Sequence, residues 1–186
     1  MKCSFIVSAF DRPDALSCML YSLKIQTERD FEVLVMDNSH GVANLNAVLD
    51  LRARDMRFRH VTAHAADCYD SANLGATMAQ GDYLCFPSDD GYYVPQFLEL
   101  MLKPAVDLMY CDMVYDPRGG AYYRTIAVQP QVGLIDKGGF LLRRERFCGF
   151  DGPLKQDRPA DGWLAERVVR EGAAHAKVPG VLWFHN

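Results

Sequence analysis

The sequence has no closely spaced cysteines, which argues against the common structural zinc sites. Its six cysteines stand singly, at Cys3, Cys18, Cys68, Cys85, Cys111 and Cys148. There is no C-x-x-C pair and no short Cys/His spacing of the kind that zinc sites use. Several lie in apolar runs such as YLCF and LMYCDMVY, where a thiol packs like a small apolar group. We therefore expect reduced core thiols and a cytoplasmic protein.

A basic charge balance and a long apolar run are also missing. The formal net charge is −4, which gives no support for nucleic acid as a main partner, because neutralising phosphates needs a basic face. No apolar stretch approaches the roughly 20 residues of a membrane-spanning helix. The start MKCSFIVSAF turns polar too soon for a signal peptide or an anchor. We expect a protein that meets its substrates in water or at a membrane surface.

The chain has the length and composition of one ordinary globular domain, and we expect a single domain over residues 1–186. It is 49% hydrophobic and 24% charged. A chain of this length buries roughly 70% of its unfolded surface, which is enough for a substantial core. No internal repeat, low-complexity tract or linker interrupts it.

The first two thirds of the sequence alternate between strand and helix patterns. Short β-rich apolar runs predict strands at 3–10, 31–37, 58–63, 82–86 and 107–116. Apolar residues at helical spacing predict helices at 15–26, 43–54, 71–80 and 95–105. We expect Asp14 to cap the first helix, Gly81 to end the third and Pro95 to begin the fourth. This order predicts an α/β fold around a mostly parallel sheet.

The last third is less regular. Residues 117–133 have hairpin-like character, and residues 138–147 are apolar and then basic. Residues 161–172 form a short amphipathic pattern that ends in glycine, which predicts one more helix.

Acidic residues follow two of the predicted strands. Asp37 comes after FEVLVM, and the pair Asp89–Asp90 follows DYLCF. Ligands of open α/β sheets bind beyond the carboxyl ends of the strands, which would bring these aspartates to one edge. Two carboxylates about 4 Å apart repel by roughly 4 kcal/mol at an effective dielectric near 20, so such a site stays wet or holds a cation. Mg²⁺ or Mn²⁺ with substrate phosphates fits these ligands, and a plain surface turn at Asp-Gly is the alternative.

Several segments resemble those of one enzyme family, in the family's order. They are SFIVSAFDRP, FEVLVMDNS, ANLGATMAQGDY, GDYLCFPSDDGYYVPQFL and PADGWLAERVVREG. They are similar to segments of the family 2 glycosyltransferases of the GT-A fold, and the likeness runs through almost the whole chain. That family transfers a sugar, commonly a hexose, from a nucleotide diphosphate sugar, usually with inversion. The resemblance implies a GT-A, Rossmann-like sheet that is mixed but mostly parallel, with flanking helices.

The resemblance assigns the metal and diphosphate site to the SDD stretch. It is similar to the family's DXD motif, in which the final aspartate holds Mn²⁺ or Mg²⁺ on the donor diphosphate. Asp90 takes that place, and Asp89 assists the metal or the ribose. Ser88 stands where a first aspartate is common. His185, in LWFHN, falls where some members place a histidine on the metal, and simple exposure is the alternative for it.

Other matched positions imply contacts to the nucleotide. Ala9, Phe10 and Asp11 match the loop that packs against the base. Asp37 matches an aspartate that hydrogen-bonds the base, usually uracil, so the donor is expected to be a UDP-sugar. Asn73 falls in the family's RN-G stretch, although Ala72 replaces the usual arginine. Core packing of Phe10 and an Asx turn at Asp37 are the plainer alternatives.

The late helix carries the expected general base, Asp161. PADGWLAERVVREG is similar to the family's ED-x-x-L helix, with Ala160 in place of the usual glutamate. Helix N-capping is the alternative role for Asp161. The resemblance thus divides the chain into a nucleotide-sugar part, 1–116, and an acceptor part, 117–186, whose hydroxyl acceptor the sequence does not identify.

Two rival functions remain open. One is a nucleotide-sugar-binding protein without transferase activity, because Ser88 and Ala160 replace acidic residues of the family pattern. The other is a metal-dependent phosphohydrolase that uses the aspartate pair. It is weaker, because no DxDx(T/V) motif follows the first predicted strand and no His/Asp metal cluster appears.

Overall fold

The strands of this computed structural model, which describes residues 1–116, 123–150 and 160–186, form one mixed sheet. Its order is β3-β2-β1-β4-β8-β6-β9-β5, and β7 pairs with β6. The strands are β1 Cys3–Ala9, β2 Phe31–Asp37, β3 Phe58–Thr62, β4 Tyr83–Cys85, β5 Gly91–Tyr93, β6 Leu108–Tyr115, β7 Arg124–Ile126, β8 Phe140–Arg143 and β9 His175–His185. The helices are α1 Pro13–Lys24, α2 Ala43–Arg52, α3 Cys68–Met78, α4 Phe97–Met101 and α5 Ala160–Arg170, and Arg144–Arg146 form a short 3₁₀ turn.

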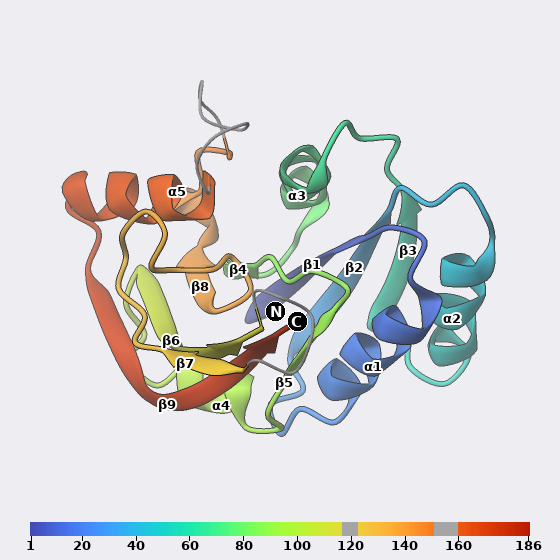
Figure 1. Cartoon of the computed structure of the whole chain (residues 1–186), viewed down its shortest axis with the longest axis horizontal. Coiled ribbons are helices and arrows are strands. Elements are labelled where there is room, and N and C mark those ends of the chain that lie inside the picture. Colours follow the sequence, from blue (N-terminus) through green and yellow to red (C-terminus); the bar gives the residue numbers. More distant parts are fainter. Residues whose placement is uncertain (117–122, 151–159) are drawn as a thin grey trace.

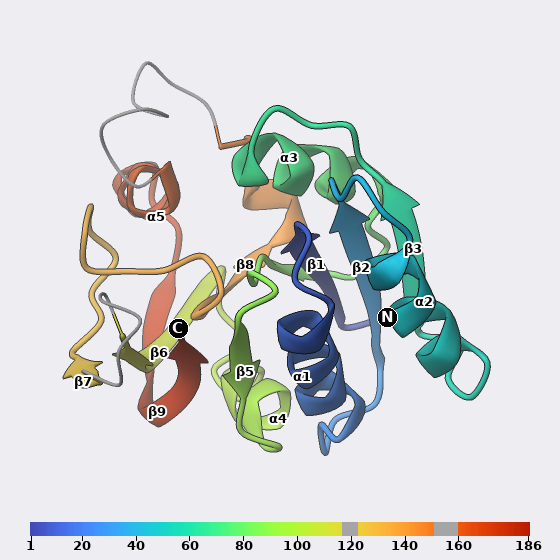
Figure 2. The same ribbon diagram turned by 45° about the vertical axis from the view of Figure 1, so that its right-hand side comes forward.

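The first half of the sheet is parallel, as its sequence predicts. Strand β1 pairs in parallel with β2 and β4, and β2 pairs in parallel with β3. Every residue of β1 and β2 is buried, which explains their unbroken apolar character. Helices α3 and α5 lie above the strands and α1 and α4 below them, in both views (Figures 1 and 2). The predicted α/β layering is confirmed.

The second half of the sheet mixes directions. Strand β8 runs antiparallel to both β4 and β6, while β9 runs parallel to β6. Strand β5 joins the edge by pairing antiparallel with the end of β9. The sequence did not predict β5 or β9. In the part of the chain that the structure describes, no helix is long and apolar enough to cross a membrane.

Helix α1 begins earlier than predicted and is not capped by Asp14. Arg12 is the N-cap residue without a side-chain capping bond, and Pro13 takes the first helical position. Proline suits that position because its fixed φ is already helical and its missing N–H has no helical partner there. Asp14 therefore falls in the first turn, where its negative charge still faces the positive helix end.

Helix α3 also differs from its predicted limits. It starts at Cys68, because the Asp67 carboxylate accepts hydrogen bonds from the backbone amides of Tyr69 and Asp70. It ends at Met78, so Gly81 is not its terminating glycine. Gly81 instead allows close approach to β1, since a Cβ there would lie 2.5 Å from the Cys3 carbonyl carbon.

Among the remaining helices, the prediction for residues 95–105 is wrong in its length and its start. Helix α4 covers only Phe97–Met101, with Gln96 rather than Pro95 at its N-cap. Helix α5 matches its prediction within two residues, and the chain leaves it at Gly172 with a φ of +86°. Glycine tolerates that left-handed conformation.

The two irregular segments behave partly as expected. Strand β7 pairs antiparallel with the end of β6, in keeping with the hairpin-like character of 117–133, although residues 117–122 lie outside the described residues. The apolar half of 138–147 is β8, and its basic half is the 3₁₀ turn.

Only some of the six cysteines are core residues. Cys3, Cys85 and Cys111 are buried, and burial raises the pKa of each thiol. Cys18 and Cys68 are exposed, so the expectation of core thiols is wrong for these two. Both lie on the solvent-facing sides of helices. An apolar stretch of sequence does not show which of its residues face the solvent.

Candidate active site

A pocket of about 430 Å³ opens beyond the carboxyl ends of β1, β2 and β4. Its lining includes Ala9, Phe10, Arg12, His40 and Ser88. An isolated parallel bridge between Ser8 and Ser88 holds the loop after β1 against the aspartate turn. The Phe10 ring is half exposed and lies edge-on to the His40 ring at 5.6 Å, so the core alternative for Phe10 is wrong.

Asp89 and Asp90 form a turn beside this pocket, and Arg12 neutralises both. Asp89 is fully buried, and its Oδ2 accepts the backbone N–H of Phe10 at 2.9 Å. The Arg12 guanidinium donates to Asp89 Oδ1 at 2.5 Å and to Asp90 Oδ2 at 2.6 Å. Burial raises the pKa of Asp89, and the charge of Asp90 adds to this, while Phe10 and Arg12 oppose it. Asp89 and Asp90 therefore form a turn, as one alternative predicted, and the same turn also presents carboxylates that could bind a metal, as the other alternative predicted.

The pairing of β5 with β9 places His185 beside Asp90. The strand register sets Gly91 opposite His185, one residue beyond the aspartate turn. Asp90 Oδ1 is buried and has no hydrogen-bond partner among the described residues. It lies 3.7 Å from His185 Nε2. A ligand that both atoms could share, such as a cation, would satisfy this oxygen.

The other imidazole nitrogen of His185 is held by Asp136. His185 Nδ1 lies 3.1 Å from Asp136 Oδ2. Burial lowers the pKa of His185, but the hydrogen bond and charge of Asp136, together with Asp90, outweigh it and raise that pKa. Metal-binding histidines commonly have such a carboxylate on the second nitrogen, which fixes the ring orientation. His185 is therefore oriented and only 21% exposed, so the simple-exposure alternative is wrong.

Asp136 itself is a residue that the sequence analysis missed. Its Oδ1 accepts the Gly138 amide at 2.8 Å and the Trp183 indole N–H at 3.0 Å. Burial favours the neutral acid, but His185 and Lys137 outweigh it, so the pKa of Asp136 lies below its ordinary value. The motif IDKGG resembles an ordinary turn, and its contacts with β9 arise only in the folded sheet.

Asp161 lies in the first turn of α5 and is 5% exposed. Its Oδ1 accepts the backbone amide of Gly162 at 2.9 Å, and its Oδ2 accepts that of Lys137 at 3.1 Å. Burial, followed by the charge of Asp136, raises the pKa of Asp161 to about 7. A carboxylate with a pKa near neutrality is suited to accept a proton at physiological pH.

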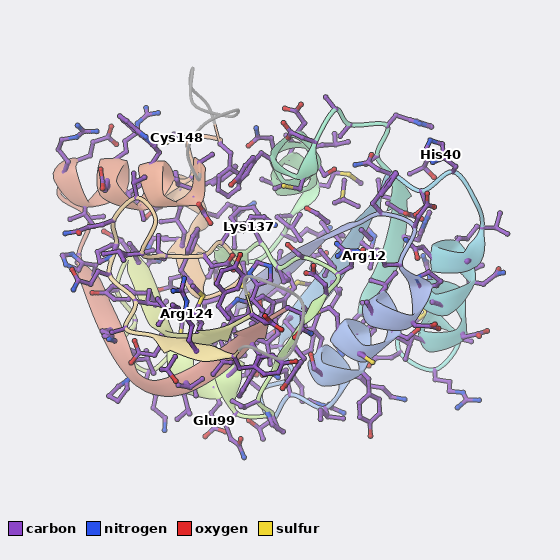
Figure 3. All side chains as sticks on the ribbon, viewed as in Figure 1. Arg12, His40, Glu99, Arg124, Lys137 and Cys148 are labelled. Atoms are coloured by element: carbon purple, nitrogen blue, oxygen red, sulfur yellow. The ribbon has the colours of Figure 1, made fainter. Side chains whose placement is uncertain are left out.

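Lys137 bonds both Asp161 and Ser88, the residue before the aspartate turn. The sequence did not indicate Lys137 as a site residue. Its side chain is buried near the centre of the molecule, with Arg12 and His40 on the α1–α2 side (Figure 3). Its Nζ donates to the Phe86 carbonyl at 2.9 Å and to Ser88 Oγ at 3.4 Å.

Asp37 ends β2 at the same edge, with its carboxylate enclosed. It accepts hydrogen bonds from the Ser39 hydroxyl and amide and from Asn44, and it lies 2.8 Å from His60 Nε2. Burial disfavours its charge, but the bonds from Ser39 and His60 hold its pKa below the ordinary value. The Asx turn through Ser39 is therefore present, and Asp37 is 4% exposed.

Two further predicted residues lie apart from the aspartate turn. Asp11, at a φ of +44°, bonds the His40 amide at 3.3 Å and its ring at 3.2 Å, which braces the loop that carries Phe10. Asn73, on α3, exchanges hydrogen bonds with the backbone of Phe150 and lines a different pocket. The structure thus brings together Ala9, Phe10, Ser88, Asp89, Asp90 and His185, but places Asn73 elsewhere.

Residues 4–149 match the family described as glycosyl transferase family 2. The chain belongs to this family. An uncharacterized glycosyltransferase of Haemophilus influenzae is 29% identical over 140 residues, which are 69% of this chain and 45% of the relative. Protein CgeD of Bacillus subtilis is 30% identical over 110 residues, or 55% of this chain and 26% of that protein. The chain thus spans less than half the length of either curated relative.

Solved structures agree with the GT-A fold of this glycosyltransferase chain. Residues 1–349 of S. aureus TarS, in complex with UDP, superpose with a TM-score of 0.77 at 17% identity, covering 100% of this chain and 61% of that one. The mannosyltransferase PcManGT from Pyrobaculum calidifontis, in complex with GDP-Man and Mn²⁺, gives 0.76 at 18% identity, covering 98% and 56%. At these identities the likeness establishes the fold, and the predicted GT-A architecture is confirmed.

Proposed function

We propose that the chain carries the catalytic site of an inverting, metal-dependent glycosyltransferase that uses a nucleotide diphosphate sugar. The observation that carries this proposal is the buried Asp90 Oδ1, which has no hydrogen-bond partner among the described residues and faces Nε2 of the oriented His185 across 3.7 Å. It lies beside a pocket at the carboxyl edge of the sheet, in a chain of this family. The work of the whole protein, including its acceptor and its cytoplasmic location, belongs to the same proposal.

The residues present fit a divalent cation that shares its ligands with a substrate. No group of three or more His, Cys, Asp or Glu side chains is arranged to hold a metal within residues 1–116, 123–150 and 160–186. Asp90 and His185 supply two ligand atoms, with Asp89 behind them. Magnesium and manganese characteristically bind through one or two protein carboxylates plus substrate phosphates. When bound, such a cation supplies positive charge against the diphosphate leaving group.

The pocket beside the aspartate turn is where we place the nucleotide. Phe10 offers a half-exposed ring to the base, Ala9 leaves room next to it, and Asp11 braces the loop. Asp37 would act on the base from the end of β2 by orienting Ser39 and His60, or directly if its bonds rearrange. The relatives' complexes contain UDP and GDP-Man, and UDP is our expectation for this chain.

Asp161 is the proposed general base. As the acceptor hydroxyl oxygen attacks the anomeric carbon, a carbon–oxygen bond forms there and the bond to the diphosphate oxygen breaks. The hydroxyl proton passes to the Asp161 carboxylate, and the electron pair of the broken bond leaves with the nucleoside diphosphate. Burial suits Asp161 to this role, because a carboxylate with a pKa of about 7 takes up a proton more readily than an ordinary aspartate.

A thermal-shift screen of UDP, GDP, CDP and dTDP, each with and without Mn²⁺, tests donor binding. A ligand at a hundred times its dissociation constant adds roughly 2.7 kcal/mol to the stability. For a domain of this size that raises the melting temperature by about 5 to 10 °C. Absence of any Mn²⁺-dependent shift from all four nucleotides would refute the proposal.

Donor consumption separates the transferase from its rivals. The matched nucleotide-sugar, incubated with Mn²⁺ and a panel of hydroxyl acceptors, should yield free nucleoside diphosphate. Asp161→Asn should abolish this yield and retain nucleotide binding. A pure nucleotide-sugar-binding protein would show the thermal shift without any turnover. A phosphohydrolase would instead release inorganic phosphate from simple esters.

A further inference from the structure

Lys137 is a buried lysine whose hydrogen bonds go to uncharged groups. The residue is 5% exposed, and its Nζ donates to the Phe86 carbonyl and to the Ser88 hydroxyl. The Lys137 charge lowers the pKa of two carboxyl groups, Asp136 and Asp161. A buried ammonium is costly unless nearby negative charges offset it, and the two carboxylates that do so here both belong to the proposed site.

The backbone of Lys137 touches both halves of the proposed site. Its amide donates to Asp161 Oδ2 at 3.1 Å, and its carbonyl accepts the Phe86 amide at 3.2 Å. The preceding residue, Asp136, holds His185. Two consecutive residues therefore contact the aspartate turn, the histidine beside Asp90 and the proposed base.

We propose that Lys137 is a positioning residue: its ammonium bonds the Ser88 hydroxyl, its amide bonds the Asp161 carboxylate, and its positive charge favours the charged form of that carboxylate. This inference rests on the proposed function for its use in catalysis. The hydrogen bond and the charge interaction between Lys137 and Asp161 can be tested without any turnover.

The charged and titratable groups that face Asp161 come from two elements. From the segment before β8, Asp136 raises the pKa of Asp161 and Lys137 lowers it. From α3, Cys68 and Tyr69 interact with the same carboxylate, and both are neutral near pH 7, because the protein partly shields the Cys68 thiol and the Tyr69 hydroxyl from water and so raises the pKa of each. Lys137 is therefore the positive charge that opposes both burial and Asp136, at the point where a base must be ionised to work.

The test compares Lys137→Met, which removes the charge, with Lys137→Arg, which keeps it. The readout is the titration midpoint of the Asp161 carboxyl, followed by its ¹³C chemical shift and assigned by its loss in Asp161→Asn. We expect Lys137→Met to raise this midpoint by about one pH unit, a tenfold loss of ionised carboxylate below the midpoint. Lys137→Arg should leave the midpoint near the wild-type value. Tyr93→Phe is the matched control, since it removes a neighbouring buried bond to the Gly138 carbonyl without removing a charge.

Each outcome decides for or against the role of Lys137. A midpoint that rises in Lys137→Met, but not in Tyr93→Phe, supports it. A midpoint unchanged in Lys137→Met, or raised equally in the control, overturns it. If Lys137→Met does not fold, the neutral variant Lys137→Gln replaces it and is judged by the same two outcomes.

Activity then separates this inference from the proposed function. In an active enzyme, the acid limb of kcat against pH should move upward in Lys137→Met with the ¹³C midpoint, while the affinity for UDP with Mn²⁺ stays within about threefold, or less than 1 kcal/mol. If the wild-type protein turns over no donor while Lys137→Met still raises the titration midpoint of Asp161, the proposed function fails. The interaction between Lys137 and Asp161 is then still supported.

Discussion

Replacing Arg12 by glutamine should destabilise the protein and, at the same time, make it bind Mn²⁺ more tightly. Arg12 is the cation that neutralises Asp89 and Asp90, at 2.5 and 2.6 Å. A divalent metal that takes Asp90 must compete with the guanidinium for the same pair of carboxylates. Glutamine keeps much of the side-chain length and can still donate one hydrogen bond, so the substitution removes mainly charge.

The structure bounds the size of this effect. Breaking a buried ion pair by removing one partner costs about 3–5 kcal/mol, whereas an exposed pair contributes about 0–1 kcal/mol. The Arg12 side chain is 50% exposed while that of Asp89 is 0% exposed, so the pair lies between these limits. We expect a loss of about 2 kcal/mol, which lowers the melting temperature by about 4–8 °C. The same lost competition should strengthen Mn²⁺ binding by up to about tenfold.

Thermal melts over a Mn²⁺ titration without nucleotide measure both effects, with isothermal calorimetry for the affinity. Arg167→Gln is the control, because it removes an arginine from an exposed ion pair with Glu171 on α5. The reasoning is refuted if Arg12→Gln melts at the wild-type temperature. Equal stabilisation of wild type and Arg12→Gln by Mn²⁺ would also refute it, since the guanidinium and the metal would then not share a site.

Three other changes test separate parts of the structure. The pKa of Asp161 is raised in the folded state, so the contribution of Asp161 to native stability is largest below about pH 4 and is lost as the pH rises through about 7. Asp161→Asn should remove up to roughly 4 kcal/mol of this fall, measured by urea unfolding at pH 4.5 and 8, and an unchanged fall would contradict the assignment. Asp136→Asn should weaken Mn²⁺ binding by about 10–100-fold, because the His185 ring would lose the carboxylate that orients it. Wild-type affinity in calorimetry would show that Asp136 does not orient His185 for metal binding. Gly81→Ala should cost about 1–3 kcal/mol in urea unfolding, because its Cβ would lie 2.5 Å from β1 backbone; a neutral result would mean that the strand moves aside.

The nucleotide side of the site could be predicted because its geometry follows from local patterns. Strands β1, β2 and β4 are short buried runs that end in polar turns, and parallel pairing brings their ends to one edge. Asp37 and the Asp89–Asp90 turn therefore lie at the same edge, on either side of the end of β1, as expected. The family resemblance added the roles of these residues, which spacing alone left open between a turn and a metal site.

The other side could not be predicted from local patterns, because long-range pairing creates it. Strand β5 has only three residues, and its partner β9 begins some 80 residues later in the sequence. Asp136 and Lys137 stand in a stretch that resembles a turn, and their contacts with His185 and Asp161 depend on that pairing. The sequence indicated His185 and Asp161 only through the family, and it gave no signal for the two residues that hold them.

The register of β5 against β9 has a consequence for how the protein acquires its site. Gly91 faces His185 across the sheet, and a Cβ at Gly91 would lie 2.1 Å from the Trp183 ring, so the fit depends on both strands being in place. Pairing segments so distant in sequence requires closing a long loop, which is slow relative to local folding. On the ribosome the β1–β4 layer can form while β9 is still unsynthesised. The nascent chain would then display the aspartate turn before it has the histidine, and the site becomes complete only when β9 pairs with β5.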